Sequence, residues 1–174
     1  LSEPEHMPKV HQGVTTELIG IDGNSYAPFH KDIDLKKMVQ INSGLDGDPN
    51  IDYDWNTVTD YLDKFDKKVS VNIAYVVGNS PLRVGAMGWN ANKASGKEID
   101  KQKGLLREAM QEGAFGISTG LDYPPGNYAD TDELVEIAKE SAKLGGFYHT
   151  HVRYRLGDKY LDPFREAIEI GKRT

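Results

Sequence analysis

Four short apolar segments, each followed by a sequence with helical periodicity, limit the possible fold more than any other feature of this chain. They span residues 13–20, 69–78, 113–119 and 145–152. The second segment, VSVNIAYVVG, is almost continuously apolar, which is typical of a strand covered on both faces in a parallel sheet. A strand followed by a helix, several times over, predicts an α/β fold.

The clearest predicted helix covers residues 130–145. Asp130 and Glu133 resemble a capping box, an apolar stripe follows, and Gly145 ends the helix. Residues 97–113 repeat this design, and we expect further helices at 32–42, 54–66 and 160–172. The stretches 43–54 and 78–96 are rich in Gly, Asn, Asp and Pro, so we expect long loops there, of the kind that carry function in α/β enzymes.

The number of strand–helix units bears on whether the fold can close. Four units use all 174 residues, whereas a closed (β/α)₈ barrel requires about 250 residues. The chain also ends inside an apparent helix. We therefore expect residues 1–174 to be a fragment of a longer protein and to hold at most half of such a barrel. A doubly wound sheet of four strands is the alternative, but no G-x-G-x-x-G motif follows the first strand to support a nucleotide site.

Charge and composition exclude several classes of partner. The chain has 21 Lys and Arg against 27 Asp and Glu, a net charge of −6, and no basic cluster, so neither nucleic acid nor an anionic membrane is expected to bind. It lacks an apolar run long enough to cross a bilayer, and its first residues do not resemble a signal peptide. We expect a cytoplasmic protein. Because cysteine is absent, any metal must be held by His, Asp or Glu.

Two histidines, His149 and His151, lie one residue apart at the end of the fourth segment. In a strand, side chains two residues apart point to the same side, and the carboxyl end of a barrel strand is the active-site face. Neutral imidazole is also the commonest metal ligand. Three interpretations stay open: a metal-binding pair, one ligand beside a bystander, or a polar strand end bonded to water or carbonyl groups. The other histidines show no ligand spacing and are expected to be solvated; they are His6, His11 and His30.

Polar residues follow the other predicted strands. Asp22 lies just past the first strand in a Gly-flanked turn, where Asp is ordinary turn chemistry. Its carboxylate would nevertheless share a rim with His151 and could bridge metal ions or orient a metal-bound water. Asn79 could donate hydrogen bonds to a substrate. The Gly- and Pro-rich loop that contains Ser118 and Tyr123 is either structural or the wall of a pocket.

Four blocks of sequence, in order along nearly the whole chain, are QGVTTELIGIDGNSYAP, VVGNSPLRVGAMGW, LLREAMQEGAFGISTGLDYPPGNYADTDEL and GGFYHTHVR. Together they resemble the N-acyl-D-amino-acid deacylase (D-aminoacylase) family of the amidohydrolase superfamily. The resemblance implies a partial (β/α)₈ TIM barrel, about strands two to five with their helices. Residues 1–174 would then be part of a single catalytic domain that is incomplete at both ends. It also implies that a metal-activated water hydrolyses the amide bond of N-acyl-D-amino acids, with one or two zinc ions (Zn²⁺) as cofactor.

The resemblance assigns roles to particular residues. His151 falls on a metal-ligating histidine of barrel strand five, and Asp22 replaces a metal-ligating cysteine of strand two. His149, where many relatives have alanine, and Arg153 become candidates for the substrate pocket.

The same resemblance implies that part of the site lies outside this chain. A further His-X-His motif is expected before Leu1. A histidine and the catalytic aspartate, which acts as general base, are expected beyond Thr174. No catalytic residue is therefore expected within the fragment, which would be inactive alone.

Other functions stay compatible with these observations. The same fold could hydrolyse another amide, such as the cyclic substrates of dihydroorotase or hydantoinase relatives. It could also be a non-catalytic scaffold in which Asp22 marks a lost site. The expected partner is a small-molecule N-acyl-amino-acid substrate, and the oligomeric state is left open.

Overall fold

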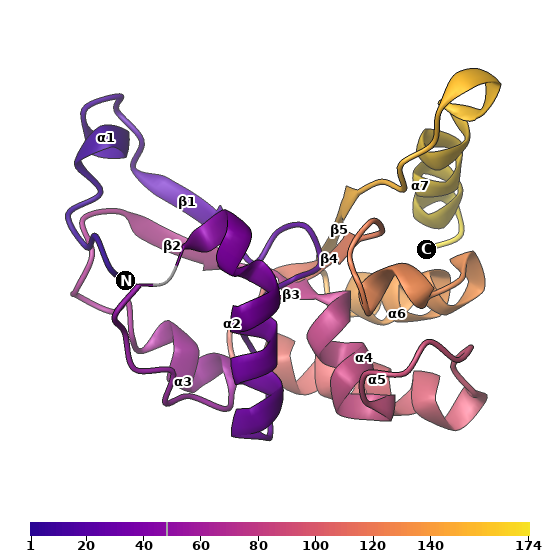
Figure 1. Cartoon of the computed structure of the whole chain (residues 1–174), viewed down its shortest axis with the longest axis horizontal. Helices are drawn as coiled ribbons and strands as arrows, with labels where there is room; N and C mark the ends of the chain where they lie inside the picture. The colour runs from indigo at the N-terminus through magenta and orange to yellow at the C-terminus, as the bar shows by residue number, and fades with distance from the viewer. Residues whose placement is uncertain (48) are drawn as a thin grey trace.

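The computed structural model describes residues 1–47 and 49–174 as a row of parallel strands with most of the helices along one side (Figure 1). The strands are β1 (Thr16–Ile19), β2 (Asn72–Tyr75), β3 (Val77–Gly78), β4 (Gly116–Gly120) and β5 (Phe147–His151). The helices are α1 (Met7–Val10), α2 (Asp32–Asp46), α3 (Val58–Leu62), α4 (Asn79–Met87), α5 (Gly96–Gln111), α6 (Thr131–Lys143) and α7 (Asp162–Lys172), with 3₁₀ turns η1 (Gly126–Tyr128) and η2 (Gly157–Lys159). The predicted α/β fold is confirmed.

The strands follow one another across the molecule in chain order. β1 pairs with β2, and β3, β4 and β5 form a second parallel sheet in that order. Val76 alone separates β2 from β3, so the predicted strand 69–78 is split in two. Two hydrogen bonds extend the pairing around this break: Val76 N donates to Ile19 O over 3.0 Å, and Phe115 N donates to Tyr75 O over 2.8 Å.

The main hydrophobic core joins the helices to one face of these strands. It contains buried side chains from α2 to α5 and from β2 to β4, among them Met38, Tyr61, Leu82, Leu106, Tyr75 and Ile117. A smaller cluster joins α6 and α7. Because side chains alternate along a strand, the packing of Ile117 and Tyr148 on the core turns their neighbours Ser118, His149 and His151 to the opposite face.

Most predicted helices occur within a few residues of their expected bounds, although α3 is shorter than residues 54–66. The prediction of a continuous loop at 78–96 is wrong, because α4 occupies residues 79–87. Pro81 lies in the first helical turn, where proline is tolerated. Gly85 allows close packing, since a Cβ atom there would lie 2.7 Å from Cδ1 of Leu105 on α5. Within the described residues, no helix is long and apolar enough to cross a membrane.

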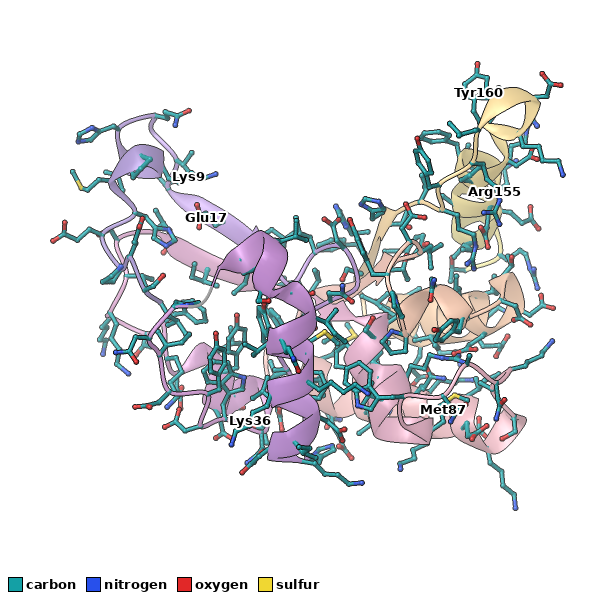
Figure 2. All side chains as sticks on the ribbon, in the orientation of Figure 1. Lys9, Glu17, Lys36, Met87, Arg155 and Tyr160 are labelled. Atoms are coloured by element: carbon teal, nitrogen blue, oxygen red, sulfur yellow. The ribbon has the colours of Figure 1, made fainter. Side chains whose placement is uncertain are left out.

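The side chains labelled in Figure 2 mark the two ends of the strand row and its helical side. Glu17 on β1 lies on one side of the view, and Arg155 and Tyr160, which follow β5, lie on the other. Lys36 of α2 and Met87 of α4 lie in the lower half with the helices.

Candidate metal centre

The carboxyl ends of β1, β4 and β5 bring two carboxylates to one imidazole. Gly120 of β4 pairs with His151 of β5, and Leu121 N extends the pairing by donating to His151 O over 3.0 Å. Nδ1 of His151 lies 4.0 Å from Oδ1 of Asp22. Nε2 of the same ring lies 3.4 Å from Oδ2 of Asp122. Each nitrogen of the imidazole therefore faces a carboxylate.

The meeting of Asp22 and His151 at one rim agrees with the expectation from the sequence, and their role as metal ligands stays a prediction. Asp122 was not predicted as a site residue. The signal that could have found it is its place two residues after the end of β4, on the strand that neighbours β5. Carboxyl ends of neighbouring parallel strands lie side by side, so an acidic residue there lies close to the histidine at the end of β5.

Asp22 is held in place by close packing of its loop on β4. Its φ of 60° lies in the left-handed region, which Asp tolerates better than most residues. Gly23 N donates to Ser118 Oγ over 3.1 Å, and that hydroxyl donates to Gly20 O over 2.5 Å. A Cβ atom on Gly120 would lie 1.8 Å from Asp22 O. The backbone of β4 therefore touches the loop directly and fixes the position of the Asp22 backbone.

Asn79 and Ser118, both predicted to line a pocket, are bonded to backbone groups of the same rim. Asn79 is 1 % exposed; its Nδ2 donates to Gly126 O over 3.0 Å, and its Oδ1 accepts from Gly120 N over 3.3 Å. Ser118 is fully buried. In this structure both side chains hold the loops together, and their contact with a substrate stays a prediction.

Tyr123 and His149 lie near His151 in different ways. The ring of Tyr123 is 5.1 Å from that of His151, centroid to centroid, at an angle of 57°. Tyr123 and Asp22 also line a cavity of about 530 Å³ that extends towards Trp55 and does not include His151. His149 shares the strand face of His151, and its Nδ1 is buried without a hydrogen-bond partner among the described residues. Both are near enough to serve a bound substrate, which stays a prediction.

Arg153, the remaining pocket candidate, is bonded to protein through all three guanidinium nitrogens. Nε donates to Oε2 of Glu166 on α7 over 2.9 Å. Nη1 and Nη2 donate to the carbonyl groups of Asn127 and Ala129 over 2.8 Å and 2.5 Å. These bonds tie the exit of β5 to η1 and α7, and a contact with substrate stays a prediction.

The donor atoms at the rim are of the kind that zinc accepts, namely imidazole nitrogen and carboxylate oxygen. The two carboxylates face different nitrogens of the ring, so they cannot both share one ion with it. Within residues 1–47 and 49–174, no group of three or more His, Cys, Asp or Glu side chains is arranged to hold a metal. A zinc site needs three or four ligands, so the pair His151 and Asp22 fits one part of such a site.

The last residues of the chain lie apart from this rim. Thr174 follows α7, and its Oγ1 donates to Ile170 O over 2.6 Å, on the last turn of that helix. The general-base aspartate that the family resemblance implies beyond Thr174 falls outside the described residues, so its place at the site stays a prediction.

No family model matches the chain, but curated proteins and solved structures resemble it over almost its whole length. The chain is 36 % identical over 176 residues to N-acyl-D-aspartate deacylase of Alcaligenes xylosoxydans xylosoxydans, covering 99 % of this chain and 34 % of that protein. A structure of D-aminoacylase, described for its binuclear metal centre, matches with a TM-score of 0.79 and 33 % identity, covering 95 % of this chain and 34 % of that one.

A second solved structure is N-acyl-D-glutamate deacylase of Bordetella bronchiseptica, in complex with zinc and a phosphonate inhibitor. It matches with a TM-score of 0.78 and 27 % identity, covering 98 % of this chain and 35 % of that one. The chain thus spans about a third of the length of the curated relatives it matches. Because similarity of sequence and of fold extends over almost all of its residues, the chain belongs to the N-acyl-D-amino-acid deacylase (D-aminoacylase) family of amidohydrolases.

Proposed function

We propose that the protein containing this chain is a metal-dependent hydrolase that cleaves the amide bond of N-acyl-D-amino acids. The observation that carries the proposal is the meeting of His151 and Asp22, from the ends of two different strands, at one rim. The names of the relatives, which include N-acyl-D-aspartate deacylase and D-aminoacylase, support the substrate class.

We also propose that the chain is part of a single catalytic (β/α)₈ barrel and supplies about strands two to five. The order of the strands supports this, because β1 pairs with β2, β3 with β4 and β4 with β5, always in chain order, whereas the order reverses in a doubly wound sheet. The surface of α7 supports it as well. Leu161, Phe164 and Ile168, three and four residues apart, are 41 %, 53 % and 57 % exposed, and such an apolar stripe is typical of a face that packs on further structure.

Within this site His151 and Asp22 would hold the metal, for which we propose zinc, as one or two ions. When bound, zinc polarises an amide carbonyl and makes a water molecule a stronger nucleophile. The close packing of the Asp22 backbone on β4 would hold the loop in place before any ligand arrives, which lowers the cost of reorganisation on binding. We propose that Tyr123 and His149 contact the substrate beside the metal. The missing ligands and the proton-transferring aspartate would come from the rest of the protein, the aspartate from beyond Thr174.

Zinc analysis of the full-length protein tests the metal site. His151→Ala and Asp22→Asn are expected to lower both the zinc content and the hydrolysis of N-acetyl-D-amino acids. His11→Ala and Asp158→Asn are matched controls, because both residues are exposed, and they should leave zinc and activity unchanged. Unaltered zinc content in His151→Ala would remove the ligand role.

The substrate class needs a separate measurement. Rates with N-acetyl-D-amino acids are compared with rates for the L-enantiomers and for cyclic amides such as hydantoins, at equal enzyme and zinc concentrations. The proposal expects the D-enantiomers to be hydrolysed fastest. A clear preference for a cyclic amide would replace it with a hydantoinase-like function, and no hydrolysis of any amide would favour a scaffold.

A further inference from the structure

The second carboxylate at His151 belongs to Asp122, and its position is set by the backbone. Its Oδ2 lies 3.4 Å from Nε2 of His151, and its Oδ1 accepts a hydrogen bond from Tyr154 N over 2.5 Å. The side chain is 28 % exposed. Asp122 therefore connects the end of β4 to the chain that follows β5, and its free oxygen is turned to the imidazole.

The contact between Asp122 and His151 affects which nitrogen of the imidazole ring carries the proton. A neutral imidazole has one N–H group and one lone pair, on different nitrogens. A carboxylate only accepts hydrogen bonds, and Asp122 lies 3.4 Å from Nε2 whereas Asp22 lies 4.0 Å from Nδ1, so the closer carboxylate favours the tautomer with the proton on Nε2 of His151. The lone pair then lies on Nδ1, the nitrogen that faces Asp22. Histidines that bind metals commonly donate their other N–H group to a carboxylate in this way.

We propose that Asp122 is a positioning residue for His151: it accepts the Nε2–H hydrogen bond and directs the Nδ1 lone pair to the ion shared with Asp22. The inference rests on the proposed function and deepens it. The 3.4 Å contact is longer than the usual N–H···O distance of about 2.7–3.2 Å. Hydrogen bonds around catalytic groups are often long before the site is complete and shorten when it is.

The tautomer is measured directly by ¹⁵N NMR of histidine-labelled, metal-free full-length protein, at a pH where the ring is neutral. The signals of His151 are assigned by their loss in His151→Ala. The expected result is an N–H group on Nε2 in the wild type. A proton on Nδ1 would overturn the inference, and this measurement requires no substitution of Asp122.

Zinc affinity provides the second readout, by competition with a chelator. Asp122→Ala is expected to weaken zinc binding by about 10–100-fold, the usual effect of removing such a partner. Asp122→Asn should recover part of this loss, because its amide oxygen still accepts a hydrogen bond without the charge. Asp158→Ala, which removes an exposed carboxylate on η2, is the matched control and should bind zinc like the wild type.

The outcomes separate this inference from the proposed function. If His151→Ala keeps its zinc, the metal site itself is wrong. If His151→Ala loses zinc and Asp122→Ala binds it like the wild type, only the positioning role fails. If Asp122→Ala loses zinc as completely as His151→Ala and Asp122→Asn recovers nothing, Asp122 is a ligand and the positioning role is again refuted.

Discussion

Replacement of Glu133 by alanine is expected to lower the free energy of unfolding by about 3–5 kcal/mol, the usual cost of breaking a buried ion pair. Arg83 on α4 is fully buried and Glu133 on α6 is 2 % exposed. Nη1 of Arg83 lies 2.6 Å from both carboxylate oxygens, and Gln102 of α5 donates to Oε1 over 2.9 Å. The substitution leaves a guanidinium group in the interior without a counter-charge, and most of the cost is the lost hydration of that group.

A matched control lies one turn along the same helix. The side chain of Glu136 is 41 % exposed and pairs with Lys103 over 3.3 Å and with Lys139 over 2.9 Å. Exposed pairs contribute about 0–1 kcal/mol, so Glu136→Ala is expected to change little. Both substitutions exchange glutamate for alanine within α6, and the small difference in helix propensity is common to the two.

Urea unfolding of the full-length protein, followed by circular dichroism, measures both variants against the wild type. The double variant Arg83→Met with Glu133→Leu should recover most of the stability, since apolar residues of similar volume often replace a buried ion pair at no cost. An equal loss in Glu133→Ala and Glu136→Ala would refute the reasoning, because burial would then not decide the cost.

Two further predictions concern the rim and the core. In Gly120→Ala the new Cβ atom would lie 1.8 Å from Asp22 O, so this substitution is expected to displace the Asp22 loop and weaken zinc binding. Gly104→Ala is the control, because its new Cβ atom would have no other atom within 4 Å. It should keep the zinc affinity and raise the free energy of unfolding by about 0.5–1 kcal/mol. Equal zinc affinity in the two variants would contradict this. Burial raises the pKa of Tyr61 and of Tyr75 above the ordinary value of 10.0. Above pH 10 the unfolded chain therefore loses protons that the folded protein keeps. The free energy of unfolding should then fall by about 1.4 kcal/mol per pH unit for each phenol. Urea unfolding between pH 9 and 11.5 should show a shallower fall in Tyr75→Phe, and an unchanged slope would exclude this source.

The approach of Asp22 to His151 could be predicted because it depends only on topology. The carboxyl ends of all strands of a parallel α/β sheet lie at one rim, so the position of Asp22 and of His151 at strand ends is enough to place both there, although β1 and β5 are not neighbours. The contact of Asp122 depends on register as well. Only the pairing of Gly120 with His151 puts residue 122 beside the ring, and that alignment is a property of the assembled sheet.

The helices show the same division between local and tertiary causes. Asp130 caps α6, accepting from Glu133 N over 2.9 Å as the capping pattern predicts. The side chain of Glu133 does not close the box, because it bonds to Arg83, 50 residues away in the sequence. The helix at Pro81 and Gly85 was also missed, since their local preferences are weaker than the packing of α4 on α5.

The polar residues at the strand ends are the hardest to interpret from sequence, because the same side chains can either bind a ligand or form hydrogen bonds with a neighbouring backbone. The close approach of backbones at the glycines of the rim distinguishes these two roles. A Cβ atom on Gly23 would lie 2.1 Å from Gly120 N, and one on Gly78 would lie 2.2 Å from Gly23 O. Backbones this close exclude water, so their N–H and C=O groups need side-chain partners, which Asn79 and Ser118 supply.

Exposure then separates supporting residues from residues that can bind a ligand. Asn79 and Ser118 are 1 % and 0 % exposed. Their hydrogen bonds already satisfy backbone groups of the closely packed layer formed by the loop after β1 and the end of β4. The side chains of Asp22, Asp122 and His151 are 42 %, 28 % and 36 % exposed and face one another just outside it. An ion can therefore approach this second group from solvent, whereas Asn79 and Ser118 are covered, and the closely packed backbone beneath supports the loops that carry Asp22 and Asp122. For this reason a substitution in the layer, such as Gly120→Ala, should alter metal affinity although it removes no candidate ligand.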